Sequence, residues 1–220
     1  AAKEQAPLYF AADLVQLERT NSALEQIEYK LDSTIAFLQA IQSLKTDLIG
    51  AYQKYNLQTA LACCKLLIQH GFDLNTNHIK AACTSVIPTS KLMGRWQILA
   101  KHPLTIAESG HNRDGIAFLM KGLAQQSYEQ LHFVLGMVND KDISIILKEL
   151  PKTAVYYFCK ANIPRGLSAD ILQQQANRFD LKGHCFSSVK AAFEAAKLAA
   201  NSEDCILIAG SIFVVAEVLP

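Results

Sequence analysis

The residues that could do chemistry gather between Gly94 and Asn112, in the segment GRWQILAKHPLTIAESGHN. Arg95 offers a guanidinium that can donate to two oxygens of a phosphate or carboxylate at once. The turn ESGHN adds a carboxylate at Glu108 and an imidazole at His111. A cation, a carboxylate and a histidine around strand ends suit an anionic ligand, but solvation or turn formation explains each residue taken alone equally well.

Three further polar residues stand where they could reach a ligand. Lys141 lies in the turn NDKD after an apolar run, Ser211 follows the last apolar run, and Asn56 opens a helix with one apolar face. Each also has a structural explanation: Asp140 beside Lys141 can cap a helix, Ser211 can belong to a turn, and Asn56 can be a helix N-cap. These alternatives stay open on the sequence alone.

An alternation of apolar runs and amphipathic segments must position these residues. Strands are expected at Trp96–Leu99, Leu104–Ala107, Leu131–Val138, Thr153–Phe158 and Cys205–Ala209. Helices are expected at Arg113–Gln125, from the NDKD turn to Leu150, at Ser168–Phe179 and at Ser187–Ala200. Continuous apolar strands separated by helices predict an α/β fold, a Rossmann-like, mostly parallel sheet with helices on both faces. Ligands of such sheets bind at the carboxyl ends of the strands, where ESGHN falls.

The residues before this alternation are less regular. We expect a strand at Leu8–Ala11, a loop or short helix at Asp13–Thr20, a strand at Ile27–Leu31 and helices at Asn56–Gly71 and Asn77–Ser85, with 34–48 ambiguous between helix and strand. The group Ile87-Pro88-Thr89-Ser90 is typical of a linker. The sequence therefore predicts two domains, 1–88 and 89–220.

Composition excludes several classes of protein. Half of the 220 residues are hydrophobic and the formal net charge is +1, so no basic field indicates nucleic acid. The closing run CILIAGSIFVVAEVLP contains Glu217 and is shorter than the roughly 20 residues of a membrane span. The six cysteines form no C-x-x-C pair, and no Cys/His cluster has metal-ligand spacing, which predicts reduced thiols and a cytoplasmic protein. No phosphate-binding G-x-x-x-x-G-K-[ST] loop and no G-x-G-x-x-G segment is present.

Five segments, in order, resemble one family. The segment DLIGAYQKYNLQTA at 47–60 is similar to the L-G-x-Y-Q-x-x-N-x-x-T-A segment of folylpolyglutamate and dihydrofolate synthases, which belong to the Mur ligase superfamily. GRWQ at 94–97 resembles their G-R-x-Q, and ESGHN at 108–112 resembles their D-x-A-H-N or D-T-G-H-N. GMVNDKD at 136–142 and GSIFVVAEV at 210–218 resemble G-M-x-x-D-K-D and G-S-x-[YF]-x-V-x-E-[VL].

The resemblance implies an ATP-dependent amide ligase. ATP and Mg²⁺ would convert a pteroate or folate carboxylate to an acyl phosphate, which the amine of L-glutamate attacks. By position, Asn56, Arg95 and Glu108 would contact ATP, and Arg95 and His111 would be catalytic, with His111 at the phosphate and glutamate end. Ser211 and Lys141 would bind substrate. Residues 1–88 would be the end of a central ATPase domain and 89–220 the C-terminal domain.

The sequence departs from the family pattern in two respects. Glu108 stands where the family has Asp, one methylene shorter, and the P-loop half is absent from this chain. The chain also begins without Met, so we expect a piece of a longer protein, with the metal ligands in an N-terminal P-loop domain that acts as its partner. Alone, the chain is expected to be inactive as a ligase. The rival interpretations are a non-catalytic nucleotide-binding module derived from such a ligase, and a Mur-type ligase of a cell-wall precursor.

Overall fold

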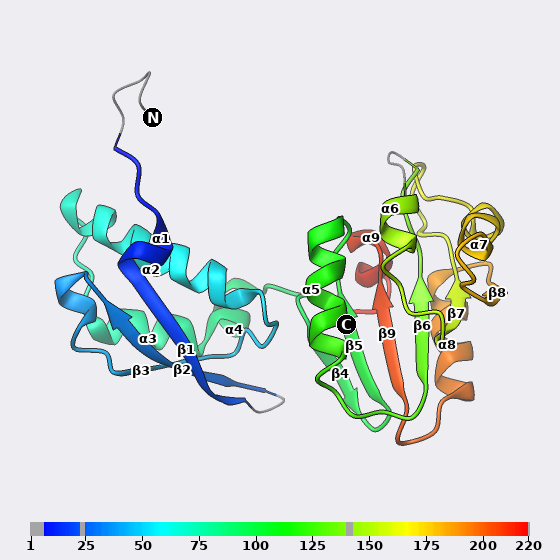
Figure 1. The fold of residues 1–220 in the computed structure, drawn as a ribbon, viewed down its shortest axis with the longest axis horizontal. Helices are drawn as coiled ribbons and strands as arrows, with labels where there is room; N and C mark the ends of the chain where they lie inside the picture. Colours follow the sequence, from blue (N-terminus) through cyan, green and yellow to red (C-terminus); the bar gives the residue numbers. More distant parts are fainter. Residues whose placement is uncertain (1–6, 23–24, 140–142, 220) are drawn as a thin grey trace. The chain divides into compact units, whose positions relative to one another are not determined.

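The computed structural model describes residues 7–22, 25–139 and 143–219 (Figure 1). The chain divides into two compact units, Ala1–Leu92 and Met93–Pro220, so the division falls a few residues after the expected boundary at residue 88. In the described ranges no helix is both long and apolar enough to cross a membrane.

The first unit packs helices on an antiparallel sheet with the strand order β1-β2-β3. Its elements are α1 (Ala11–Leu14), β1 (Val15–Ser22), β2 (Ile27–Ser33), the 3₁₀ helix η1 (Ala36–Leu38), β3 (Ser43–Thr46), α2 (Gln53–Gln69), α3 (Thr76–Thr84) and α4 (Val86–Ser90). Alternate residues of β1 and β2 are buried, and one core cluster joins them to the apolar faces of α2 and α3. This alternation is what an antiparallel sheet with one covered face requires.

Several local predictions for this unit were wrong. Leu8–Phe10 lie outside any regular element and Ala11 begins a helix, whereas Asp13–Thr20 runs from the end of α1 into β1. Val15 and Leu17 are buried and the exposed Gln16 lies between them, a period-two pattern that becomes a strand only through pairing with β2. The expected linker at 87–90 is part of α4, because the Asp47 carboxylate accepts the otherwise unpaired amides of Val86 and Ile87.

The predicted N-cap role of Asn56 was also wrong. Helix α2 begins at Gln53, with Tyr52 in the N-cap position, and Asn56 lies in its first turn. The Asn56 amide group donates to Oε1 of Gln53 at 2.8 Å, a bond between neighbouring helix positions. The predicted end was correct: Gly71 follows the helix with φ of +87°, the left-handed conformation that ends many helices.

The second unit is built on a sheet whose described strands have the order β4-β5-β9-β6-β7-β8 (Figure 1). The strands are β4 (Gln97–Lys101), β5 (Leu104–Glu108), β6 (Leu131–Leu135), β7 (Val155–Phe158), β8 (Gly183–Cys185) and β9 (Cys205–Ala209). Only β4 pairs in the antiparallel sense within the described sheet. The predicted α/β architecture with a mostly parallel sheet is confirmed.

Helices cover both faces of this sheet. They are α5 (Arg113–Leu123), α6 (Ser144–Leu147), α7 (Ala169–Asn177), α8 (Val189–Ala199) and α9 (Ile212–Ala216). Residues of α8 and α9 share one core cluster with Val134, Ile206 and Ile208 of the central strands. Because successive strand residues point to opposite faces, the buried Phe133 and Leu207 belong to the other face. The central strands are therefore buried on both faces and apolar at most positions, with His132 of β6 as a buried polar residue.

The differences in this unit are at element ends. Strand β6 ends at Leu135 rather than Val138, and the short edge strand β8 was not predicted. Helix α6 is shorter than the predicted helix to Leu150, and the Asp140–Asp142 part of its expected capping turn lies outside the described residues. Ser168 occupies the N-cap position of α7 but makes no side-chain cap hydrogen bond, whereas the unpredicted cap Ser188 of α8 does, at 3.1 Å.

Candidate functional site

The turn ESGHN occupies the carboxyl end of β5. Glu108 is the last residue of β5 and is in register with Ala209, near the end of the neighbouring parallel strand β9. Asn112 caps α5 directly after the turn, and its side-chain oxygen accepts from the Gly115 amide at 2.7 Å. The turn therefore links the carboxyl edge of the sheet to a helix N-terminus, the arrangement in which α/β proteins bind anions.

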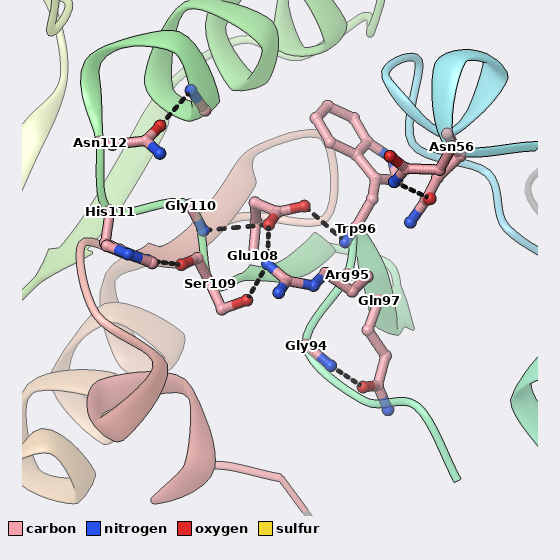
Figure 2. A network of polar contacts seen from close by, with 12 residues as sticks. Asn56, Gly94, Arg95, Trp96, Gln97, Glu108, Ser109, Gly110, His111 and Asn112 are labelled. Atoms are coloured by element: carbon pink, nitrogen blue, oxygen red, sulfur yellow. Dashed lines mark hydrogen bonds and ion pairs between the residues drawn. The ribbon is translucent and has the colours of Figure 1, made fainter. Parts of the chain in front are cut away.

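Glu108 is buried, with 2% of its surface exposed, although it is a carboxylate at the edge of the sheet. Its Oε2 accepts from the backbone N–H of Trp96 at 2.8 Å, and its Oε1 accepts from the backbone N–H of Gly110 at 3.0 Å. Figure 2 shows the carboxylate between these two backbone segments. A buried carboxylate needs such partners, because desolvation would otherwise favour its neutral form.

Arg95 lies beside the same carboxylate, in the segment that leads into β4. Its Nη1 donates to the Ser109 hydroxyl at 2.6 Å and lies 3.8 Å from Oε1 of Glu108 (Figure 2). Its side chain is 38% exposed. Both contacts use Nη1, whereas a guanidinium carries five N–H donors, so Arg95 is anchored and can still present donors to an anion.

The backbone that carries Arg95 has an uncommon shape. Gly94 has φ of +68° and Trp96 has φ of +50°, a conformation that costs a bulky residue about 1–3 kcal/mol. A Cβ on Gly94 would lie 2.7 Å from Cγ1 of Val215, so glycine is required there for space as well as for φ. The Trp96 side chain packs on Gly122 of α5, where an added Cβ would lie 2.6 Å from the ring. Packing and hydrogen bonds together hold this segment.

His111 is exposed at the end of the turn. Its Nδ1 lies 3.1 Å from the carbonyl oxygen of Ser109. A carbonyl oxygen only accepts, so this contact places a proton on Nδ1 and leaves Nε2 as the acceptor of the neutral ring. The structure thus brings Arg95, Glu108 and His111 to one turn, as the sequence analysis expected.

The remaining candidates are placed less directly. Ser211 is buried and caps α9, accepting from the Phe213 amide at 3.3 Å, which agrees with its turn interpretation and does not test its substrate contact. Asn56 belongs to the first unit, and Lys141 lies outside the described residues. The predicted ligand contacts of all these residues stay predictions.

Three groups of the site had no predicted role. They are the Ser109 hydroxyl, which contacts Arg95, and the backbone amides of Trp96 and Gly110. Ser109 was part of the ESGHN segment, but nothing in the sequence indicates which side chain its hydroxyl contacts. The amides carry no sequence signal, because every residue except proline has one.

Neither metal ligation nor thiol chemistry has support among the described residues. They contain no group of three or more His, Cys, Asp or Glu side chains able to hold a metal ion. Burial raises the pKa of Cys83 to about 11 and those of Cys159 and Cys205 to about 12. These thiols stay protonated at neutral pH and are poor nucleophiles.

Comparisons with known proteins identify relatives of this chain. Residues 94–212, more than half of the chain, match the family model of the Mur ligase, glutamate ligase domain. The dihydrofolate synthase/folylpolyglutamate synthase of Escherichia coli is 31% identical over 192 residues, which cover 86% of this chain and 42% of that protein. E. coli FolC in complex with DHPP and ADP is similar in structure, with a TM-score of 0.68, 28% identity and coverage of 88% of this chain and 45% of that chain.

A bifunctional folylpolyglutamate synthase/dihydrofolate synthase with Mn, AMPPNP and L-glutamate bound has a TM-score of 0.60 and 29% identity, covering 73% of this chain and 38% of that one. The chain thus spans less than half the length of each of these relatives. These relatives are folate glutamate ligases, and the matched family segment includes Arg95, Glu108 and His111. The chain belongs to the Mur ligase family, through its glutamate ligase domain.

Proposed function

We propose that this chain supplies the glutamate ligase domain of an ATP-dependent amide ligase that adds L-glutamate to dihydropteroate or to a (tetrahydro)folate. The observation that carries the proposal is Arg95, fixed through Nη1 to Ser109 and Glu108 at the carboxyl edge of a family-matched sheet. The relatives with ADP, or with AMPPNP, Mn and L-glutamate, support a nucleotide and an amino acid as ligands.

The reaction would have two steps. An oxygen of the substrate carboxylate attacks the γ-phosphorus of ATP, and the bond to ADP breaks to leave an acyl phosphate. The amine of L-glutamate then attacks the acyl carbon, inorganic phosphate leaves, and the amine nitrogen loses a proton. A fixed guanidinium lowers the barrier of both steps, because negative charge grows on phosphate oxygens that it can reach.

Several candidate residues have a proposed part in this scheme. Arg95 contacts the phosphates. His111 donates Nδ1–H to Ser109, so Nε2 is the acceptor that takes the proton from the attacking amine. Ser211 and Lys141 bind glutamate.

Magnesium would neutralise the phosphates, and we expect its ligands outside the described residues, in a P-loop ATPase domain. The cytoplasmic location stays a prediction.

The test is a ligase assay on the complete gene product with ATP, Mg²⁺, L-glutamate and either dihydropteroate or tetrahydrofolate. We expect phosphate release that requires glutamate, and a glutamylated product. Arg95→Ala should lower kcat/KM about 100-fold or more, in the range measured when one donor to a developing oxyanion is removed. Arg178→Ala, the same change on an exposed arginine just beyond α7, should leave it unchanged.

Two outcomes would change the proposal. Nucleotide binding without product formation would favour the non-catalytic nucleotide-binding module. Phosphate release that depends on ATP and glutamate by the 220-residue chain alone would contradict the expected need for a P-loop half. The reading frame upstream of Ala1 should encode a G-K-[ST] loop.

A further inference from the structure

Among the candidate site residues, Glu108 has the surroundings least suited to direct contact with a ligand. Its side chain is 3% exposed, and each carboxylate oxygen accepts a backbone N–H, one from Trp96 and one from Gly110. We propose that Glu108 is a positioning residue, which holds the Arg95 loop (residues 94–97) so that the guanidinium faces the nucleotide. This inference rests on the proposed function for the identity of the ligand, but not for the loop itself.

The Arg95 loop needs such a restraint. Two of its residues, Gly94 and Trp96, have positive φ, and for tryptophan this conformation persists only when surrounding contacts impose it. The Ser109 amide donates to the Gly94 carbonyl at 2.9 Å, and the Gly94 amide donates to Oε1 of Gln97 at 2.8 Å. Glu108 adds the bond to the Trp96 amide, the residue with the strained φ.

Glu108 also couples the loop to the turn. Its Oε1 meets both the Gly110 amide and the Arg95 guanidinium, at 3.0 and 3.8 Å. Since the Arg95 Nη1 also donates to Ser109, the guanidinium is fixed between two neighbouring residues of the same strand end. Loss of the carboxylate would release the loop at Trp96 and remove the countercharge of Arg95 in one change.

A carboxylate that contacts ATP could also accept directly from the hydroxyls of the ATP ribose. The length of the Glu108 side chain separates the positioning role from this direct contact. Aspartate at 108 would end one carbon–carbon bond, about 1.5 Å, nearer the backbone. The Oε2–Trp96 bond of 2.8 Å would then exceed hydrogen-bond length. A positioning role therefore predicts that Glu108→Asp weakens nucleotide binding. A ribose contact predicts instead that aspartate, the residue in the family pattern at this position, leaves nucleotide binding unchanged or improves it.

The first experiment measures the loop without any ligand. Trp96 is the single tryptophan of the 220 residues and is 7% exposed, so its fluorescence reports the Arg95 loop directly. Acrylamide quenching should rise at least twofold in Glu108→Gln and Glu108→Asp. The Gln side chain has one acceptor oxygen and must place its donating NH₂ group against the second backbone N–H, and the Asp side chain is too short. Glu194→Gln, an exposed carboxylate on α8, is the matched control. Unchanged quenching in both Glu108 variants, with circular dichroism confirming their folds, would overturn the proposal.

The second experiment uses the complete gene product and compares ADP with 2′,3′-dideoxy-ADP. If Glu108 acts through Arg95, Glu108→Gln loses the same factor, about tenfold or more, for both nucleotides, and adds little to Arg95→Ala. A loss confined to ADP would instead identify a ribose contact and overturn the proposal. No binding of ADP by the unmodified protein would contradict the proposed function, and the quenching result would still decide whether Glu108 holds the loop.

Discussion

At the scale of single residues, burial decides what the polar groups of this protein do. No buried side-chain nitrogen or oxygen in the described ranges lacks a hydrogen-bond partner. Glu108 is one example, and the buried trio of His132, Tyr157 and Asp204 is another. Nδ1 of His132 lies 2.9 Å from the Tyr157 hydroxyl and Nε2 lies 3.3 Å from Oδ2 of Asp204. This trio lies toward the amino ends of β6 and β9, away from the ESGHN turn, which fits a structural histidine.

The lowered pKa of Asp204 predicts how the stability of the fold changes with pH. The hydrogen bond from the Asn201 amide, followed by bonds from His132 and the Gln130 amide, lowers the pKa of Asp204 below its ordinary value. A carboxyl whose pKa is lower in the folded state stabilises the fold above its unfolded pKa, and this contribution is lost as the pH falls.

Asp204→Asn should therefore lower the free energy of unfolding by about 1–3 kcal/mol at pH 7. The difference from the unmodified chain should shrink as the pH falls below about 4, the ordinary carboxyl range. Urea denaturation at pH 7, 5 and 3.5 measures it, with the exposed Glu203→Gln as control. A difference that stayed constant with pH would contradict the assignment.

At the scale of elements, some helices begin where a side chain accepts their first amides, and others begin without such a bond. Ser188 accepts from the Ala191 amide at the start of α8, whereas Ser168 stands in the same position before α7 and makes no such bond. The sequence cannot separate these two serines, because both are preferred N-cap residues before an amphipathic segment.

Ser188→Ala should destabilise the chain by about 1 kcal/mol, the ordinary value of an N-cap hydrogen bond. Ser168→Ala is its matched control and should change stability by less than about 0.5 kcal/mol. Thermal or urea unfolding of both variants compares them directly. Equal losses would mean that the two caps are equivalent in solution.

The contact between α5 and the Arg95 loop is a second feature at this scale. Gly122→Ala would place a Cβ 2.6 Å from the Trp96 ring, with no room to accommodate it. We expect a loss of about 1–3 kcal/mol together with a red-shifted Trp96 emission, because the ring must leave its site. Lys121→Ala, at the exposed neighbouring position of α5, should change neither. An unshifted emission in Gly122→Ala would contradict this packing.

At the scale of the whole molecule, the two units have separate cores. One cluster contains residues from Val15 to Cys83, and a second contains residues from Ala107 to Val215. Every member of each cluster lies within one unit, so each unit has a hydrophobic core of its own.

Residues 93–220 should therefore fold when expressed alone. We expect a cooperative thermal transition by calorimetry and well-dispersed amide signals in a ¹H–¹⁵N spectrum. The Trp96 emission should match that of the full chain. A non-cooperative transition would mean that the first unit contributes to the stability of the second.

The sequence alone predicts the α/β class and the approximate order of elements in the second unit. Short, continuous apolar runs that alternate with amphipathic segments are typical of buried parallel strands separated by helices. The sequence also places Glu108 and His111 in one polar turn after a strand. Arg95 precedes β4, and only the antiparallel pairing of β4 with β5 brings it to that turn. The sequence failed for β1, whose two buried residues indicate a strand only once β2 pairs with it.

The contacts of Glu108 follow only from the folded chain. The sequence offers a carboxylate in a polar turn, and such a carboxylate equally suits a ribose or an amide. The fold brings the Trp96 amide to one of its oxygens and the Gly110 amide to the other, and it buries the group between them. The physical reason is distance in the chain: the Trp96 contact joins residues 12 positions apart, and local pattern carries no information on which backbone amide will lie opposite a given side chain.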